Sequence, residues 1–179
     1  MLFRSDNVIY IGTNGKMTEV CAAMGLTNLE GIDVLVTASR RNYTAYKKEL
    51  ARIPGLHLRE YDSRERSNYQ YIVLELDHSQ AGVTRDELIQ ILHAENILAR
   101  RYFWPGCHKL EPYRSYYPHA GLLLPETERV AARVIILPTG ACVRGVDIRC
   151  LCSIIRFVEQ HASEVRHQLD ALRQSKKGR

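Results

Sequence analysis

The chain has 179 residues, of which 45% are hydrophobic and 25% are charged, as in ordinary soluble globular proteins. This composition excludes a disordered chain, collagen and a coiled-coil rod, and no apolar run approaches the length of about 18 residues that a membrane span needs. The net charge is +5, but Lys176, Lys177 and Arg179 contribute to it from the C-terminal tail. The basic balance is therefore a weak sign of nucleic-acid binding.

The first part of the chain predicts two long helices. Residues 8–11 form a short apolar run that ends in a turn, and apolar residues at helical spacing follow as far as Leu29. We expect Asn14 to cap this first helix, because its side chain can accept a backbone N–H hydrogen bond. A second helix is expected over residues 31–53, where a Pro-Gly pair ends it.

The middle of the chain predicts strands around one helix. Residues 56–61 and 69–76 alternate apolar and polar side chains, as half-buried strands do. Thr84 and Glu87 form a capping-box sequence, which predicts the start of the next helix. Residues 96–103 are expected to form a further strand.

The last third predicts a loop, two helices and a strand. Residues 107–121 are expected to form an ordered loop, because their tyrosines need burial. Residues 125–133 predict a helix with proline at its start, residues 134–138 a short buried strand, and Asp147 the cap of a last helix over residues 148–173. The fold class predicted is α+β, with two long helices feeding a small, mostly antiparallel sheet with flanking helices.

We expect three parts along the chain and a cytoplasmic location. The parts are a connecting segment with the first helix in residues 1–30, a small domain in residues 31–175, and a basic frayed tail in residues 176–179. The N-terminus lacks the apolar core of an export signal, and the five cysteines show no C-x-x-C spacing. The seven histidines are scattered, so no metal site is predicted.

The turn before the first helix is one candidate site. A helix N-terminus offers free backbone N–H groups to an anion, and Asn14 and Lys16 would add a side-chain donor and a cation. The alternative is a capped helix start with an exposed lysine. The spacing here is not that of a P-loop.

The segment 102–108 is a second candidate site, because it contains the only tryptophan, Trp104, beside Cys107 and His108. A Cys107–His108 dyad is not expected, since catalytic dyads are usually assembled from distant segments. Two interpretations stay open. The segment is either an aromatic-anchored loop or a substrate platform in which an imidazole and ring edges line a pocket.

Four ordered motifs carry a family resemblance. The pattern Gly-x-Asn-x-Arg-Met-x-Glu, then Ala-Ala-x-Gly, is matched by Gly12, Asn14, Met17, Glu19, Ala22, Ala23 and Gly25, with Lys16 in place of the arginine. The later motifs comprise Arg40, Arg41, Tyr46 and Leu50; Trp104, Pro105, His108 and Tyr113; and Leu124, Pro125, Glu128, Arg129, Leu137 and Pro138. By these motifs the chain resembles the C-terminal part of the DegT/DnrJ/StrS family, the sugar aminotransferases that use pyridoxal phosphate.

The resemblance implies the small C-terminal domain of a fold type I aminotransferase. Such an enzyme transfers an amino group, usually from glutamate, to a keto-sugar bound to a nucleotide. The resemblance implies that Asn14 reaches the cofactor phosphate in the neighbouring subunit of a dimer, with Lys16 as a nearby cation. It also implies that His108 and Trp104 line the sugar side of the pocket, although one extra residue separates Pro105 from His108.

The resemblance also implies that catalytic parts are missing from these residues. The family's Schiff-base lysine follows a serine by five positions, upstream of the Gly-x-Asn motif, and none of the six lysines here has that serine. We therefore expect no catalytic residue, no covalently bound cofactor and no transaminase activity of the chain alone. The expected partner is a second copy or a chain with the catalytic half, not nucleic acid or a membrane. The alternative is a free-standing dimeric or partner-binding domain that has lost catalysis.

Overall fold

The computed structural model describes residues 15–177, with side chains up to residue 174, and divides the chain into two units, Met1–Val34 and Leu35–Arg179. The first unit contains helix α1 (Glu19–Glu30). Its cap is Thr18, whose hydroxyl accepts a hydrogen bond from the Cys21 N–H at 3.3 Å. The predicted cap, Asn14, lies outside the described residues, and the residue that caps the described helix is Thr18.

Helix α1 carries large apolar side chains that its own unit leaves exposed. Met17, just before the helix, is 73% exposed, and Val20, Met24, Leu26 and Leu29 are each more than 60% exposed. None of the residues of α1 is buried. Gly25 has no neighbouring atom within 4 Å of where a Cβ would stand, so no close packing within the structure requires it.

Helix α2 (Ile32–Leu50) follows Gly31 and gives its buried side to the core of the second unit. The buried residues are Asn42, Tyr43, Tyr46 and Leu50. The helix ends three residues before the predicted limit. The turn that follows brings Gly55, with φ +71°, against the backbone of Ala81.

The described strands form one three-stranded antiparallel sheet in the order β1-β2-β3. The strands are β1 (Leu56–Leu58), β2 (Ile72–Leu76) and β3 (Val134–Leu137). The central strand buries alternate residues, as its sequence predicts. The sheet and its surrounding helices confirm the predicted α+β fold class.

Residues 96–103 do not form the predicted strand. A single residue, Arg100, makes an antiparallel bridge to Ile136 on β3. Asn96, with φ +58°, instead makes a turn, and its N–H donates to the carbonyl of His93. Apolar content alone therefore overestimated the extent of pairing here.

Four further helices surround the sheet: α3 (His78–Ala81), α4 (Arg85–Ala94), α8 (Gly145–Gln160) and α9 (Ala162–Lys177). The capping box of α4 is confirmed, with hydrogen bonds between Thr84 and Glu87 in both directions. The single last helix predicted is wrong, because the chain breaks at His161 into α8 and α9. Asp147 lies in the first turn of α8 and accepts from the backbone N–H of Arg144.

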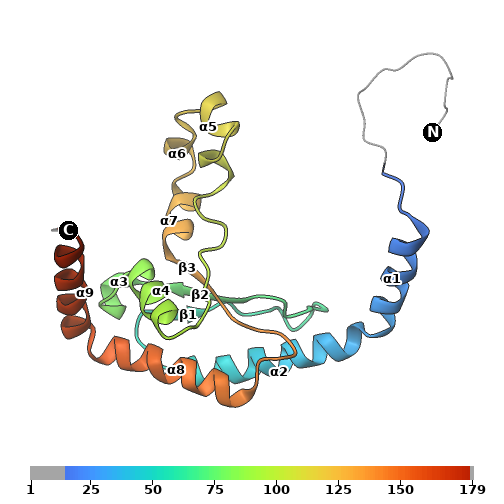
Figure 1. Cartoon of the computed structure of the whole chain (residues 1–179), viewed down its shortest axis with the longest axis horizontal. Coiled ribbons are helices and arrows are strands. Elements are labelled where there is room, and N and C mark those ends of the chain that lie inside the picture. Colours follow the sequence, from blue (N-terminus) through green and yellow to red (C-terminus); the bar gives the residue numbers. More distant parts are fainter. Residues whose placement is uncertain (1–14, 178–179) are drawn as a thin grey trace. The chain divides into compact units, whose positions relative to one another are not determined.

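The core lies between the sheet and the helices α2, α4 and α8 (Figure 1). Side chains with less than 2% exposure include Tyr46, Ile72, Leu74, Leu76, Leu88, Leu92, Ile135, Leu137, Ile148 and Ile155. These residues come from two strands and three helices, so the second unit is held by apolar contacts between segments far apart in sequence.

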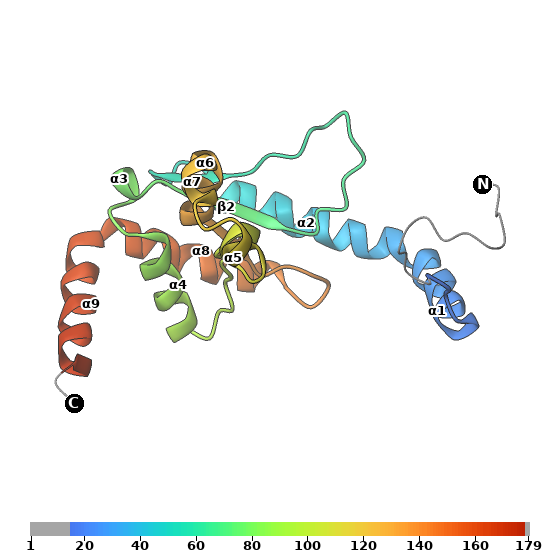
Figure 2. The same ribbon diagram turned by 90° about the horizontal axis from the view of Figure 1, so that it is seen from above.

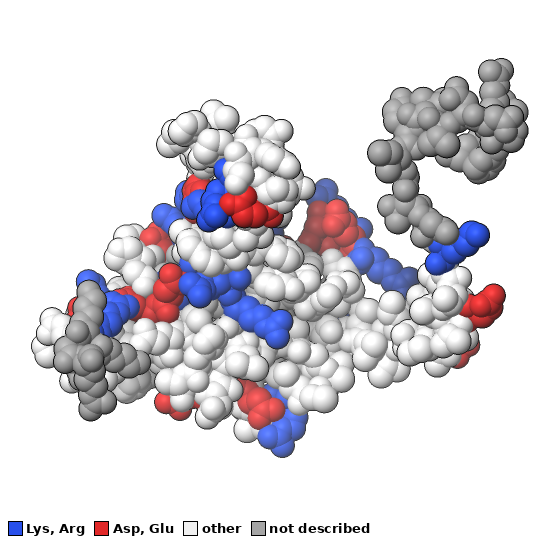
Figure 3. All heavy atoms as spheres, turned by 45° about the horizontal axis from the view of Figure 1, so that its top comes forward, with Lys and Arg blue, Asp and Glu red and all other residues white. Residues whose placement is uncertain are grey.

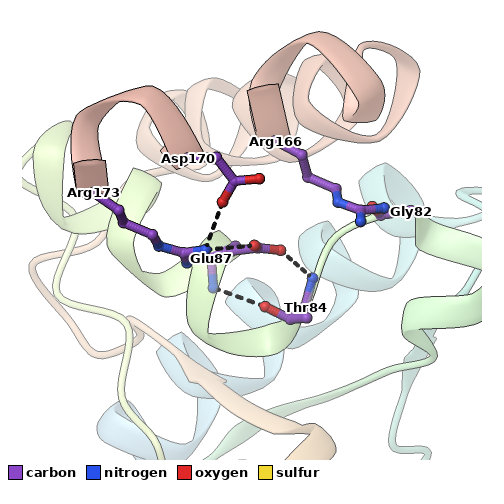
Figure 4. Close-up of polar contacts among 6 residues, drawn as sticks. All are labelled: Gly82, Thr84, Glu87, Arg166, Asp170 and Arg173. Carbon is purple, nitrogen blue, oxygen red and sulfur yellow. Dashed lines mark hydrogen bonds and ion pairs between the residues drawn. The ribbon is translucent and has the colours of Figure 1, made fainter. Parts of the chain in front are cut away.

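An ion-pair network fixes α9 beside the start of α4 (Figure 4). Glu87 is only 7% exposed, and its carboxylate accepts from the Thr84 N–H at 2.9 Å and from Arg173 at 3.4 Å. Arg173 also contacts Asp170 at 3.1 Å. Arg166, nearer the start of α9, donates to the carbonyl of Gly82 at 3.4 Å.

An arm extends from the sheet on the side opposite α2 and α8 (Figures 1 and 2). The arm comprises the 3₁₀ turn η1 (Cys107–Lys109) and helices α5 (Tyr113–Tyr116), α6 (Ala120–Leu123) and α7 (Pro125–Arg133). The helix predicted for residues 125–133 is confirmed, whereas the predicted loop contains two short helices. Figure 3 shows the tip of the arm as mostly uncharged, and Leu122 and Leu123 there are at least 80% exposed.

Among the described residues, no single helix is long and apolar enough to cross a membrane, although α1 and α2 pass that test of length and composition when they are taken together. No group of three or more His, Cys, Asp or Glu side chains in this part of the chain is arranged to hold a metal ion.

Candidate functional site

The predicted anion site at the start of α1 is described only in part. Asn14 lies outside the described residues. Lys16 lies in the first unit with its side chain exposed, two residues before the cap of α1. The N–H groups of a helix start and an exposed ammonium both attract negative charge, as an anion site requires.

The base of the arm brings His108 together with two charged side chains. The His108 Nε2 lies 2.7 Å from Oε1 of Glu128, which is in α7. The Lys109 ammonium donates to the other carboxylate oxygen of Glu128 at 2.6 Å. Both contacts lower the pKa of Glu128, that with Lys109 the more, so its carboxylate stays ionised at neutral pH. The side chain of His108 is only 9% exposed.

Trp104 lies beside two cations. The Arg85 guanidinium is 4.7 Å from the centroid of the indole ring, and the Lys109 ammonium is 5.8 Å from it. Arg85 is 4% exposed, pairs with Asp86 at 2.9 Å and donates to the carbonyl of Ala131 in α7. A buried guanidinium over an indole face is a favourable cation–π contact, which fixes the ring of Trp104.

A cavity of about 940 Å³ lies between residues 102–108 and the helices of the arm. Its lining is mostly apolar and includes His108, Tyr102, Phe103, Tyr113, Tyr117 and Leu124. The structure therefore places His108 at a cavity with aromatic walls. Trp104 is not among the lining residues, and contacts of Lys109 with the indole ring and with Glu128 connect it to His108.

The surroundings of each lysine with a described side chain indicate whether it could attach an aldehyde cofactor covalently. Lys47 pairs with Glu60 at 2.7 Å, and this contact raises the pKa of Lys47. Lys109 pairs with Glu128. Lys16 and Lys48 are exposed. A Schiff base needs a neutral amine, which burial in an apolar pocket would favour and pairing with a carboxylate opposes. Pairing with carboxylates therefore opposes covalent attachment at Lys47 and Lys109, whereas the exposed ammonium of Lys16 matches a phosphate group in charge.

Sequence reasoning missed three residues that build this site. Arg85 follows the capping Thr84, and nothing in the sequence around it indicates its contact with the indole of Trp104. Lys109 and Glu128 are 19 residues apart, so their pairing depends on the fold of the arm. Only Glu128 had a signal, as part of the late Glu-Arg motif.

Comparison with known proteins finds one matching family and several relatives. The sequence model of the DegT/DnrJ/EryC1/StrS aminotransferase family matches residues 3–156. A dTDP-4-amino-4,6-dideoxy-D-glucose transaminase of Shigella dysenteriae is 31% identical over 153 residues, which make up 86% of this chain and 41% of the relative. A GDP-perosamine synthase of Vibrio cholerae is 29% identical over 144 residues, 79% of this chain and 38% of the relative.

Solved structures show the same similarity in three dimensions. The crystal structure of DesI in the presence of its TDP-sugar product has a TM-score of 0.80 and 42% identity, over 89% of this chain and 40% of that chain. The structure of S. venezuelae DesV in complex with a ketimine intermediate has a TM-score of 0.72 at 22% identity, over 87% and 40% of the two chains. The second likeness shows the fold alone. The chain thus spans about 40% of the length of the relatives it matches.

Proposed function

Because the chain belongs to the DegT/DnrJ/EryC1/StrS aminotransferase family, we propose that it forms the C-terminal portion of a sugar-nucleotide aminotransferase. The family depends on pyridoxal phosphate, which when bound carries the amino group between donor and acceptor. The proposed reaction moves an amino group, usually from glutamate, to a nucleotide-linked keto-sugar. The observation that carries this proposal is the cavity beside His108, which lies in the segment that bears the family motif.

The chemistry of the cavity supports a deoxy-sugar as the part bound there. Aromatic and aliphatic side chains dominate its lining, and its volume of about 940 Å³ is ample for a sugar ring. A sugar that lacks hydroxyl groups costs less to bury against such walls than a fully hydroxylated one. The Shigella dysenteriae relative is named for a dideoxy-sugar, in agreement with this substrate class.

The residues of the chain would divide the work between two regions. His108 would hydrogen-bond a polar group of the sugar, while Tyr113 and Tyr117 would pack against the ring and exclude water. Trp104 would support this wall from outside the cavity. Asn14 and Lys16 would contact the cofactor phosphate, with Lys16 acting as a point charge because an ammonium cannot bind a phosphate as a guanidinium fork does.

The amine that attaches the cofactor would come from outside these 179 residues. The ion pair with Glu60 raises the pKa of Lys47, and a protonated amine cannot attack a carbonyl group, while the Lys109 ammonium is engaged by Glu128. The catalytic half would be supplied by a further region or a partner chain, in a cytoplasmic dimer. The exposed apolar side chains of α1, such as Val20 and Met24, support a protein partner for that helix.

Borohydride reduction tests the first part of this proposal. The purified chain is mixed with pyridoxal phosphate, reduced with borohydride and mapped by peptide mass spectrometry. We expect no single lysine to be modified stoichiometrically. One lysine modified in full would overturn the proposal that the attachment site lies elsewhere.

Co-expression with a catalytic portion tests the second part. The chain is produced with the N-terminal part of the Shigella dysenteriae transaminase that lies outside the matched 41%. The assay follows transfer of the amino group from dTDP-4-amino-4,6-dideoxy-D-glucose to 2-oxoglutarate, with the N-terminal part alone as control. Glutamate formed only in the co-expressed sample supports the proposal. A soluble complex without activity would instead favour the alternative, a partner-binding domain that has lost catalysis.

A further inference from the structure

The contact between His108 and Glu128 determines which ring nitrogen of His108 carries the proton. A carboxylate only accepts hydrogen bonds, so the Nε2 that lies 2.7 Å from Glu128 Oε1 must be the protonated nitrogen. In the neutral imidazole, Nδ1 is then the acceptor. The geometry alone thus selects one of the two tautomers.

Lys109 keeps Glu128 in the form that this selection needs. Its ammonium donates to Glu128 Oε2 at 2.6 Å, on the oxygen that His108 does not use. The pKa of Glu128 is lowered by these two partners, so the carboxylate remains an acceptor through the neutral range. One side chain of α7 therefore holds both neighbouring residues of η1.

Two glycines allow the pair to approach this closely. A Cβ on Gly106, which has φ +94°, would lie 2.9 Å from Cε1 and 3.1 Å from Nδ1 of His108. A Cβ on Gly121 would lie 3.1 Å from Oε1 of Glu128. The Nδ1 edge of the imidazole therefore lies beside Gly106, which itself lines the cavity.

We propose that Glu128 is a positioning residue that fixes the Nε2–H tautomer of His108 and so presents Nδ1 as an acceptor for a hydroxyl or other donor of the bound ligand. The identity of that ligand as a nucleotide-linked sugar rests on the proposed function, whereas the tautomer does not. Glu128 acts on the ligand only through His108. A carboxylate that served packing alone would have no effect on the protonation pattern of the imidazole.

Nitrogen-15 NMR of the histidine rings tests this proposal on the 179-residue chain. Spectra recorded near pH 9, well above the ordinary histidine pKa of about 6.5, distinguish the two neutral tautomers. The His108 ring is identified among the seven histidines by the signals that the H108Q variant loses. The wild-type ring is expected as the Nε2–H tautomer. An Nδ1–H tautomer would overturn the proposal without any variant of Glu128.

Three variants separate positioning from packing. Glu128→Leu is expected to give a mixture of the two tautomers, because no acceptor remains for Nε2–H. Glu128→Gln is expected to keep the wild-type tautomer, since its carbonyl oxygen still accepts. Glu111→Gln is the matched control, because Glu111 is a glutamate of the same arm that pairs with Arg114 at 2.7 Å and is 50% exposed. An unchanged tautomer in a folded Glu128→Leu variant would refute the role of Glu128.

Ligand titration connects the tautomer with binding. We expect dTDP-4-amino-4,6-dideoxy-D-glucose to bind Glu128→Leu about twofold more weakly than wild type, because about half of the His108 rings would then carry the proton on Nδ1 and could not accept, and to bind Glu128→Gln nearly as well as wild type. Equal affinity in all three proteins would contradict the proposed acceptor role. If no sugar nucleotide binds even the wild type in the co-expressed complex, the proposed function fails while the tautomer result still stands or falls by NMR.

Discussion

The hydroxyl of Tyr46 offers a test of the core at the level of one hydrogen bond. Tyr46 is fully buried in α2, and its hydroxyl donates to the carbonyl of Pro138 at 2.8 Å. Tyr46→Phe keeps the ring and its apolar contacts, so only the hydrogen bond to the Pro138 carbonyl is lost. We expect the free energy of unfolding to fall by about 1–2 kcal/mol. For a chain of this size, that loss lowers Tm by about 2–8 °C.

A second tyrosine provides the matched control. The hydroxyl of Tyr61 donates to the carbonyl of Tyr71 at 2.7 Å, in an exposed position where water can replace it. Tyr61→Phe is therefore expected to cost less than about 0.5 kcal/mol. Urea unfolding followed by circular dichroism measures both variants, and the m-values should match that of the wild type. Equal losses in the two variants, or no loss in Tyr46→Phe, would refute the reasoning from burial.

The same hydroxyl gives a pH dependence with a definite sign. Burial raises the pKa of Tyr46 above its ordinary value, with smaller contributions from Cys152 and Asp147. A group whose pKa is raised on folding contributes its full stability below the unfolded pKa of about 10 and loses it as the pH rises toward the folded value. The stability advantage of wild type over Tyr46→Phe should therefore shrink above pH 10. An advantage that stays constant to pH 11.5 would contradict this.

Three further predictions follow from geometry and burial. Gly55→Ala is expected to lower the free energy of unfolding by about 2–4 kcal/mol, because φ is +71° and the new Cβ would lie 2.5 Å from a backbone nitrogen. Gly25→Ala, in open space within α1, should raise it by about 0.5–1 kcal/mol, and thermal unfolding measures both variants. Arg173→Gln is expected to lower the free energy of unfolding by less than about 1 kcal/mol, and by less still at high salt, because its side chain is 49% exposed. Glu87→Ala should lower it by about 1–2 kcal/mol, because the N–H of the capping Thr84 loses its acceptor. Iodoacetamide at pH 8 should label four cysteines in the folded chain and should label Cys152 only in denaturant, because burial raises the pKa of Cys152 to about 12. Mass spectrometry counts the labels, and early labelling of Cys152 in the folded chain would contradict its burial.

Elements with a strong local signal could be predicted from the sequence. The capping box of Thr84 and Glu87 places the start of α4 correctly, and the proline at residue 125 begins a helix that ends at Arg133 as expected. Both signals act within one helical turn, so no other part of the chain has to be known. The alternation in β2 worked for a similar reason, since it reports which face of a strand is buried.

The break at His161 depends on contacts between distant segments and could not be predicted in this way. No glycine or proline marks it, and the apolar spacing continues through it. A Cβ on Gly82 would lie 2.7 Å from the Cβ of Ala162, so the first residue of α9 packs directly on the turn after α3. Arg166 adds a hydrogen bond to the Gly82 carbonyl. The position of the break is therefore set by a turn some eighty residues earlier in the chain.

The sequence could predict which segment contains the candidate site, but not how its side chains are arranged. The family resemblance pointed to Trp104 and His108, yet only His108 lines the cavity. The reason lies in charges that no local pattern reveals. Arg85 approaches the indole from α4, and Glu128 approaches the imidazole from 20 residues further along the chain.

The two edges of the small sheet limit how this chain can associate. On one side β1 has only three residues, and on the other the backbone of Arg100 exchanges both hydrogen bonds with Ile136 of β3. A strand from another molecule would find few free, adjacent backbone groups at either edge, and short or covered edges are how proteins avoid continuous sheet growth. Side chains on the helices and the arm are therefore better placed than these edges to contact a partner, and their surfaces can evolve for particular partners with less risk of fibrous assembly.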